Sequence, residues 1–316
     1  MTSLPSYDEL RRTPEGAPSA WGLFGETDNV GLFNLITPSE VKRAAGLIRK
    51  GAVFPLDAAV DAFSPAFFPS RGVPRHRVLH REHSVMFDDV IDNFYPQASS
   101  QWDSLGHMGY SEDEFYNGAT AADVGAGRRN TIEHWARRGI VGRAVLLDVA
   151  RTLADEGRPL DPASATGIEV ADLELARERV GVEFEPGDVV LIRMGFAEWY
   201  LGQSAEVRTG LPGNFAAAGL AQNEEMCRYL WDHHVSAVAA DNVGLEVWPP
   251  QGAPGPFRFL HNILIGQFGL AIGELWWLAD LAADCANDGV YEMFLCSSPL
   301  HLPGGIGSPA NAIAIK

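Results

Sequence analysis

Three short runs of almost purely apolar residues limit what this chain can fold into. They cover residues 144–149, 189–193 and 236–240. A strand of this composition is expected to be buried on both faces, because almost no polar side chains alternate along it. Residues 171–180 and 224–233, which precede the second and third runs, have helical patterns. Helix followed by strand therefore recurs along the chain, which is typical of an α/β protein.

Local signals predict the other elements. Thr37-Pro38-Ser39-Glu40 has the form of a capping box with proline at the first helical position, and it predicts a helix that stops at Gly51. A short helix is predicted over 130–138. Residues 64–83 carry prolines and three histidines and predict a long loop. Further strands are predicted over 53–60, 84–91, 289–296 and, as an edge strand, 312–315.

Composition narrows the class of protein. The chain has 316 residues, of which 46% are hydrophobic and 21% are charged, so it can bury a sizeable core. Its net charge of −17 disfavours nucleic acid and anionic membranes as partners, because both would repel it. Three cysteines without a Cys-x-x-Cys pair indicate neither a zinc knuckle nor a disulfide framework. With no leader pattern and no membrane-length apolar run, we expect a cytoplasmic protein.

The chain divides into an N-terminal arm and a single larger domain. Residues 1–36 are rich in proline, glycine and polar groups with interspersed aromatic residues, which predicts an irregular arm anchored on a surface. Residues 37–316 show no internal repeat and no linker between autonomous parts. We therefore expect one domain over 37–316, with the arm able to cross to a neighbouring subunit.

The stretch from Gln97 to His107 gathers polar groups that can act together. If it is extended, Gln97, Gln101, Asp103 and His107 share one face, and Trp102 points to the other. Such a cluster suits a metal ion or a water molecule, since it offers charged oxygen, amide oxygen and imidazole nitrogen. The alternative is a polar loop whose side chains only satisfy neighbouring backbone groups.

Three residues later in the chain are also candidates. Asp241 follows the apolar run 236–240, where α/β sheets commonly place functional groups, although it is equally well explained as a turn residue. Glu274 lies in an apolar run, residues 270–278, that has the pattern of a buried helix, so its carboxylate needs a cation, an arginine or a proton. For Glu274, a structural salt bridge and the binding of a metal ion are equally good interpretations. For His261 considered alone, the favoured interpretation is a core histidine whose hydrogen bonds are satisfied within the protein.

Taken in order along the chain, these motifs resemble the cyclase family of metal-dependent hydrolases, which includes bacterial kynurenine formamidases, isatin hydrolases and trans-dienelactone hydrolases. The resemblance covers nearly the whole chain. The motifs that carry it are Trp21-Gly22 through Thr37, Gln101-Trp-Asp103 with Gly106-His107, Tyr116-Asn-Gly118, Arg138 to Arg143 with Leu146-Leu-Asp148, Asp241-Asn242 with Glu246, His261 ahead of Glu274, and Gly307-Ser308-Pro309.

The resemblance implies a mixed β-sheet with flanking helices, the swivelling β/β/α-like fold of the family, in a homodimer or homotetramer. It also implies a divalent ion, Mn²⁺ or Zn²⁺, and a small-molecule substrate. His107 takes the role of general base, and Trp102, Phe115, Tyr116 and Asp241 are expected to bind substrate. The implied metal ligands are Gln97, Gln101, Asp103, His261 and Glu274.

The metal motif departs from the better-known members of the family. Those members carry His-x-Gly-Thr-His-x-Asp-x-Pro-x-His, whereas this chain has Gln97 and Gln101 in place of the first two histidines and keeps Asp103 and His107. An amide oxygen is a neutral, harder donor than imidazole and is less suited to zinc. The glutamine form resembles that of trans-dienelactone hydrolases.

The expected activity is hydrolysis of a small lactone or amide through a metal-activated water. A serine hydrolase is disfavoured, because Gly-x-Ser-x-Gly does not occur. Two alternatives stay open. One is a non-catalytic or weakly metallated protein that binds a small ligand, and the other is a ring-closing cyclase or dehydratase that uses the same site with water excluded.

Overall fold

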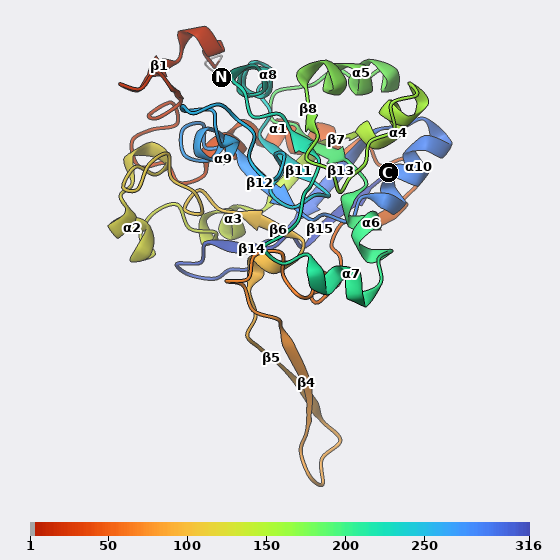
Figure 1. Ribbon diagram of the computed structural model, residues 1–316. Helices are drawn as coiled ribbons and strands as arrows, with labels where there is room; N and C mark the ends of the chain where they lie inside the picture. The colour runs from red at the N-terminus through yellow and green to blue at the C-terminus, as the bar shows by residue number, and fades with distance from the viewer. Residues whose placement is uncertain (1–3) are drawn as a thin grey trace.

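A mixed nine-stranded sheet organises the computed structural model, which describes residues 4–316 (Figure 1). Its strand order is β14-β6-β12-β11-β9-β7-β13-β15-β3. The strands are β3 (Val53–Pro55), β6 (Gln101–Asp103), β7 (Ile140–Asp148), β9 (Val189–Arg193), β11 (Ala237–Ala240), β12 (Ala271–Glu274), β13 (Glu292–Ser297), β14 (Gly307–Pro309) and β15 (Ala312–Ile315). The predicted mixed sheet is thereby confirmed.

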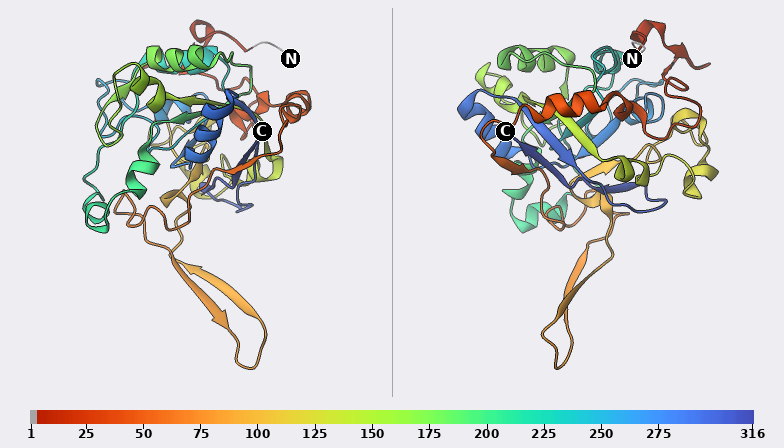
Figure 2. Two further views of the ribbon diagram at one scale, coloured as in Figure 1. Left: turned by 90° about the vertical axis from the view of Figure 1, so that its right-hand side faces the viewer. Right: turned by 180° about the vertical axis from the view of Figure 1, so that it is seen from behind.

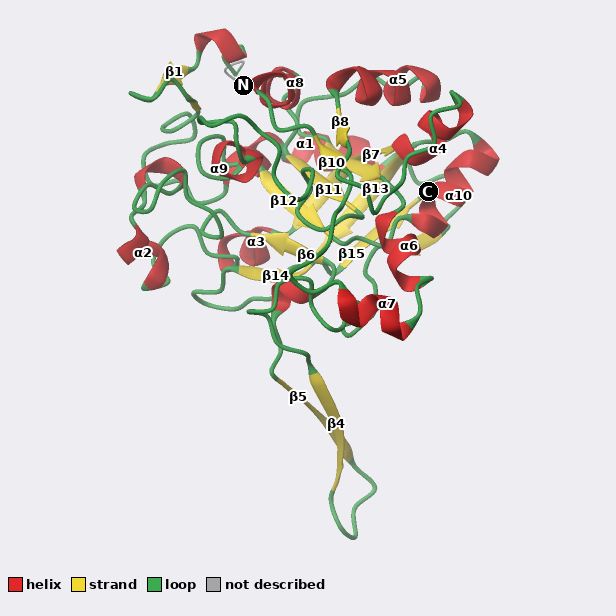
Figure 3. Ribbon diagram, in the orientation of Figure 1, coloured by secondary structure: helices red, strands yellow, loops and turns green. Residues whose placement is uncertain are grey.

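Helices flank this sheet (Figure 3). They are α1 (Pro38–Ala45), α2 (Ala121–Gly125), α3 (Glu133–Arg138), α4 (Val149–Asp155), α5 (Val170–Val180), α6 (Phe196–Leu201), α7 (Ala205–Gly210), α8 (Glu224–Asp232), α9 (Leu260–Leu264) and α10 (Ala279–Asp288). Single 3₁₀ turns are η1 (Tyr7–Glu9), η2 (Gly31–Leu35), η3 (Pro96–Ala98) and η4 (Tyr116–Gly118). Two-stranded pairs are β1 (Arg11–Arg12) with β2 (Pro18–Ser19), β8 (Gly167–Ile168) with β10 (Gly219–Leu220), and β4 (Arg75–His80) with β5 (Phe87–Asp92).

The central strands confirm the prediction from apolar runs. β7, β9, β11 and β12 are parallel neighbours, and nearly all of their residues are buried. α1 crosses the face of the sheet that is seen from behind in Figure 2, while α5 and α8 lie along the top of Figure 1. Helix α1 begins with the predicted capping box, in which the backbone N–H of Thr37 donates to Glu40 at 3.0 Å. This arrangement covers both sides of the parallel strands.

Four predictions of local structure are wrong. The helix α1 ends at Ala45, before Gly51. Residues 64–83 are not one loop, because β4 forms there and pairs with β5. The run 270–278 is not a helix but the strand β12 and a turn, since a short apolar run fits either structure when it is buried all round. β15 is not an edge strand, because β3 pairs with its outer side.

The described part of the N-terminal arm packs on its own chain. Tyr7 is buried, and its backbone N–H donates to Asp232 of α8 at 2.7 Å. The indole of Trp231 donates to the carbonyl oxygen of Pro5, and that of Trp21 donates to Gly266. Among helices within residues 4–316, none combines the length and the apolar character needed to cross a bilayer.

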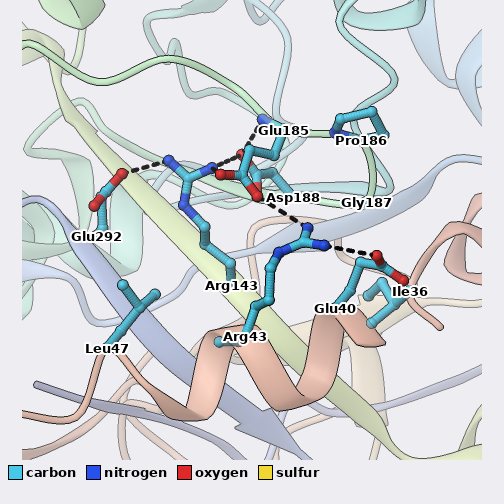
Figure 4. Close-up of a pocket in the computed structure, with 11 residues that line it drawn as sticks. Ile36, Glu40, Arg43, Leu47, Arg143, Glu185, Pro186, Gly187, Asp188 and Glu292 are labelled. Atoms are coloured by element: carbon cyan, nitrogen blue, oxygen red, sulfur yellow. Dashed lines mark hydrogen bonds and ion pairs between the residues drawn. The ribbon is translucent and has the colours of Figure 1, made fainter. Parts of the chain in front are cut away.

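An ion-pair network joins α1 to the sheet around a cavity of about 130 Å³ (Figure 4). Arg143 of β7 contacts Asp188 at 2.9 Å and Glu292 at 2.5 Å. Arg43 of α1 contacts Glu40 and Glu185, each at 3.0 Å. Burial raises the pKa of Asp188 to about 7, even though Arg143 opposes the shift. This cavity is lined by none of the candidate metal ligands, and we assign it a structural role.

Replacing Arg143 with methionine should destabilise the fold in a pH-dependent way. The change leaves Asp188 buried without its cation, which costs about 3–5 kcal/mol when the carboxylate is ionised. Asp188 already has a raised pKa in the folded protein, so lowering the pH below about 7 favours its proton and removes the unpaired charge. Urea unfolding should therefore show a large loss of stability at alkaline pH that shrinks toward mildly acidic pH.

Arg43→Met is the matched control, because the Arg43 side chain is 57% exposed. Its loss should cost no more than about 1 kcal/mol. Equal costs for the two variants, or a cost for Arg143→Met that does not change with pH, would contradict this account of the network.

Candidate metal centre

The structure brings three of the predicted ligands together. Asp103 comes from β6, His261 from α9 and Glu274 from the end of β12, and one ligand atom of each lies within 4.8 Å of the others. All three side chains are buried, with exposed fractions of 0% for Asp103, 3% for His261 and 5% for Glu274. Residues far apart in sequence thus form one compact donor set.

Strand register explains why these groups meet. β6 runs antiparallel to β12, and Gln101 is the direct pairing partner of Glu274. Directly opposed side chains on one face of a sheet lie in contact. The Gln101 amide nitrogen accordingly donates to Glu274 at 3.2 Å and to the Asp103 oxygens at 3.2 and 3.3 Å. The indole of Trp276 donates to the Gln101 carbonyl oxygen at 2.9 Å, which fixes the strand at this point.

Gln97 and His107 reach the same centre from outside β6. Gln97 lies in the turn η3, not on an extended strand, and its amide nitrogen donates to Asp103 and to Nδ1 of His107, the latter at 2.7 Å. Gly307 makes room for it, because a Cβ there would lie 2.5 Å from Cγ of Gln97. Nε2 of His107 is 3.8 Å from Asp103, and its side chain is 21% exposed. His107 is therefore more open to solvent than the three buried ligands.

Glu246 is part of the site, and the sequence analysis did not assign it a role. It is fully buried and accepts from Nδ1 of His261 at 2.6 Å. The backbone N–H groups of Leu260 and His261 and the amide of Gln222 also donate to it. A carboxylate on Nδ1 fixes the orientation of a histidine and leaves its Nε2 lone pair for a metal. That Nε2 faces Glu274 at 3.1 Å.

The centre carries more buried negative charge than its histidines neutralise. Within residues 4–316, no lysine or arginine forms an ion pair with Asp103, Glu246 or Glu274. Burial alone would lower the pKa of His261, but its hydrogen bonds to Glu246 and Glu274 raise that pKa to about 10. Burial opposes ionisation of Glu274, yet the hydrogen bond from His261 holds its pKa below the ordinary value. The site therefore favours added positive charge.

A divalent cation fits this donor set. Two carboxylates and an imidazole are ligands common to Mn²⁺ and Zn²⁺ sites. The amide oxygen of Gln101 is buried and has no hydrogen-bond partner in the structure. Rotating the amide would turn this oxygen toward two carboxylates, an arrangement that is favourable only with a cation between them. The unpartnered oxygen and the excess carboxylates both support a cation site at Asp103, His261 and Glu274, with Gln97 and Gln101 beside it.

The predicted substrate-binding residues lie in different settings. Trp102 is in the core, where it packs on Trp276 and donates to Ser297 at 2.9 Å. Tyr116 is buried and donates to Asp28 at 3.0 Å, and Phe115 beside it is half-buried. Asp241 is fully buried and accepts from the backbone N–H groups of residues 194 and 195, each at 2.7 Å. The contacts of Asp241 match its alternative role as a turn residue, and Trp102 is an ordinary core residue with no exposed surface.

Aromatic residues near the centre were missed by the sequence analysis. Phe259 is half-buried and stacks on His261, with ring centroids 4.8 Å apart. The Arg71 guanidinium donates to the Gln97 carbonyl oxygen and lies 5.0 Å over the ring of Phe68. Phe68 in turn meets Trp248 edge to face at 5.4 Å. All four residues lie outside regular elements, so no periodic pattern marks them.

The comparisons with known proteins agree with this description. The model of the cyclase family matches residues 53–247, more than half of the chain. The chain is similar to a solved structure described as a novel cyclase, with 34% identity and a TM-score of 0.83, covering 94% of this chain and 99% of that one. No curated protein matches the chain. The resemblance inferred from sequence motifs is thus confirmed.

More distant structures share the fold. Isatin hydrolase A from Labrenzia aggregata, solved with benzyl benzoate, has 16% identity and a TM-score of 0.59, and the match covers 86% of this chain and 94% of that one. Isatin hydrolase A from Ralstonia solanacearum has 16% identity and a TM-score of 0.58, over 87% and 94% of the two chains. At this level of identity the similarity shows the fold alone.

Adding Mn²⁺ or Zn²⁺ to chelator-treated protein should raise its resistance to thermal unfolding. A ligand that binds only the folded state stabilises it by about 2.7 kcal/mol when its concentration is 100 times its dissociation constant. Glu274→Gln removes one of the two charges that attract the ion, so the ion should no longer shift the melting temperature of this variant. Differential scanning calorimetry with and without metal measures both effects.

Glu225→Gln on the exposed face of α8 is the control, and it should respond to metal as the unaltered protein does. A metal-induced shift that survives in Glu274→Gln would place the ion elsewhere.

Proposed function

The chain belongs to the cyclase family, and from this premise we propose that it is a metal-dependent hydrolase that cleaves a small lactone or amide. The observation that carries the proposal is the pairing of a partly exposed imidazole, His107, with a buried cluster of two carboxylates and a histidine. A protein that only binds a ligand has no need of a base placed beside such a cluster.

The buried residues contribute different groups to the proposed ion site. Asp103 and Glu274 supply the negative charge, and His261 supplies a nitrogen whose direction is set by Glu246. Gln97 and Gln101 offer neutral amide oxygens. A bound divalent ion lowers the pKa of a water molecule and polarises the substrate carbonyl. Mn²⁺ suits this oxygen-rich set better than Zn²⁺, because amide and carboxylate oxygens are hard ligands.

His107 serves as the base that receives a proton and returns it to the leaving group. A base needs a free lone pair on the nitrogen that faces the reacting atoms. If the Gln97 amide presents its oxygen to Nδ1, the imidazole keeps its proton on Nδ1 and its lone pair on Nε2. In the structure the Gln97 amide nitrogen donates to Nδ1, which corresponds to the other tautomer, with the proton on Nε2. The orientation of the Gln97 amide therefore decides which tautomer His107 adopts, and the base role requires the amide to be turned so that its oxygen faces Nδ1.

Aromatic side chains near the centre favour a planar substrate. Phe259 stacks on His261, and Phe68 and Trp248 meet edge to face beside Arg71. Flat rings stack on such surfaces with ring centroids about 4.5–7 Å apart. The name isatin hydrolase of two structures with the same fold supports a ring-opening reaction as one case to assay.

His107→Ala should lower kcat by about 10²–10⁴-fold, because it removes proton transfer without removing an ion ligand. The assay compares as-purified, chelated and Mn²⁺- or Zn²⁺-reconstituted protein on dienelactones, N-formylkynurenine and isatin, with metal content measured on the same samples. His301→Ala, an exposed histidine in the segment before β14, is the control and should keep full activity.

Loss of turnover together with loss of bound metal would show that His107 is a ligand instead. If none of the substrates is turned over by metal-loaded protein, the binding-protein alternative gains support.

Gln101→His tests whether the amide weakens zinc binding. An imidazole in place of the amide adds a nitrogen ligand that zinc prefers, so the affinity for Zn²⁺ should rise more than the affinity for Mn²⁺. Competition with a chromogenic chelator gives both dissociation constants without any assay of turnover. Equal changes for both ions would argue that Gln101 does not contact the metal.

A further inference from the structure

Arg71 brings a positive charge to the edge of the candidate metal centre. It lies just before the hairpin of β4 and β5 (Figure 1), and its guanidinium donates to the carbonyl oxygen of Gln97. Burial raises the pKa of Glu274, but His261 and then the charge of Arg71 lower it. Arg71 is thus close enough to the buried carboxylates to act on them electrostatically.

The guanidinium of Arg71 has an edge that is free for a ligand. Within residues 4–316, Arg71 forms no ion pair with a carboxylate. A guanidinium carries five N–H donors, and Arg71 uses Nη1 for the carbonyl oxygen of Gln97. Its Nε and Nη2 donate to nothing in the described part of the chain, and neither is closed off from solvent. Such an edge can bind both oxygens of one carboxylate.

Other contacts hold this guanidinium in position. It lies 5.0 Å over the ring of Phe68, and Phe68 meets Phe215 and Trp248 edge to face at 5.7 and 5.4 Å. Phe215 is buried and stacks on Trp248. A charged group that is fixed before a ligand arrives loses little conformational entropy on binding. Arg71 is therefore better suited to recognise a carboxylate than a mobile surface arginine.

Gln97 connects Arg71 to the proposed base. Its carbonyl oxygen accepts from Arg71, and its side-chain amide lies 2.7 Å from Nδ1 of His107. The same amide contacts Asp103. Only one residue therefore lies between Arg71 and the groups that would act on the substrate carbonyl. A small molecule that carries a carboxylate near its reacting carbonyl can reach both.

The charges of the buried cluster explain why a cation is needed here. Asp103, Glu246 and Glu274 are buried and carry three negative charges when ionised, of which a divalent ion offsets two. With His261 neutral as an ion ligand, the cluster keeps one negative charge, which would repel an anionic substrate. Arg71 supplies the one positive charge that brings the sum to zero. More distant acidic groups matter less, because physiological salt screens them beyond about 8 Å.

We propose that Arg71 binds a carboxylate carried by the substrate, and that the chain acts on anionic lactones or amides in preference to neutral ones. This inference rests on the proposed hydrolase function and names the chemical class of its substrate. The carboxylate accepts hydrogen bonds from Nε and Nη2, which fixes the direction from which the reacting carbonyl approaches the ion and His107. Arg71 thereby determines specificity without taking part in proton transfer.

Calorimetric titration of the Mn²⁺-loaded protein with benzoate and with benzamide tests the carboxylate site. The two probes share a ring, and only benzoate is charged. Arg71→Gln keeps N–H donors but removes the charge, so the dissociation constant for benzoate should rise by about 10- to 100-fold while that for benzamide stays unchanged. Arg71→Lys retains a charge without the paired donors and should keep part of the affinity. Arg49→Met, an exposed arginine after α1, is the control and should bind both probes as the unaltered protein does.

Three outcomes of this titration overturn the proposal. The first is equal benzoate affinity in the unaltered protein and in Arg71→Gln, since another group then binds the carboxylate. The second is an unaltered protein that does not bind benzoate at millimolar concentration, and the third is an equal loss of affinity for both probes, which indicates a structural role. If near-ultraviolet circular dichroism shows that Arg71→Gln does not fold, Arg71→Lys decides, and a benzoate affinity equal to that of the unaltered protein then overturns the proposal.

Turnover of two matched lactones separates this proposal from the hydrolase function. γ-Butyrolactone-γ-carboxylate and γ-valerolactone share a ring and differ by a carboxylate in place of a methyl group. The unaltered protein should have the higher kcat/KM for the carboxylate, and Arg71→Gln should remove this preference mainly through KM. Benzoate binding that depends on Arg71, without turnover of either lactone, supports the carboxylate site and counts against the hydrolase function. Equal effects of Arg71→Gln on both lactones overturn the carboxylate site and leave the hydrolase function in place.

Discussion

Two carboxylates that face each other in a dry interior govern this structure. Asp103 and Glu274 lie on neighbouring strands, nearly shielded from water, and Glu246 adds a third buried charge behind His261. Bringing ionised groups so close together without water is costly, and a single imidazole does not offset it. The surrounding residues form a site suited to a cation. Glu246 orients His261, the amides of Gln97 and Gln101 lie on two sides, and Trp276 binds the backbone of β6.

The register between β6 and β12 gives this site its shape. β6 is antiparallel to a strand that otherwise belongs to a parallel set, so the side chains of Gln101 and Asp103 come alongside the carboxyl end of β12. The paired strand β14 closes the other side, and its Gly307 leaves the space that Gln97 occupies. A slip of one residue in this pairing would turn Gln101 and Asp103 into the core and Trp102 toward the ion.

The elements that were predicted correctly from the sequence are those marked by hydrophobic periodicity or by a helix cap. The buried strands β7, β9 and β11 have apolar runs, α1 has its capping box, and Gln101 and Asp103 alternate with Trp102 as a strand requires. Of the hairpin formed by β4 and β5, the sequence predicted a strand over 84–91, where β5 lies, but it assigned the residues of β4 to a loop. The residues of β4 are all exposed, so no buried face marks this strand in the sequence. Glu274 was assigned to a helix, since a short apolar run fits either structure. Glu246 and Phe259 come from irregular segments whose positions depend on the tertiary fold.

The root of the hairpin formed by β4 and β5 lies next to this group of carboxylates. Arg71 precedes the hairpin and donates to the carbonyl oxygen of Gln97, which follows it. Gln97 in turn contacts Asp103 and His107. The residue at the root of the hairpin therefore helps to hold the turn that carries Gln97, and it is connected to His107 through a single peptide group.

The amides of Gln97 and Gln101 also affect how metal binding at the site depends on pH. An imidazole ligand takes up a proton near its pKa of about 6.5, so protons and metal compete for it at mildly acidic pH. A carboxamide has no such proton to gain. In this chain only His261 and the carboxylates can exchange an ion for protons, and the carboxylates do so at lower pH than an imidazole. With Gln97 and Gln101 in place of two histidines, two fewer positions around the site gain a proton on mild acidification, whereas His261, whose pKa is raised to about 10, competes for a proton already at neutral pH.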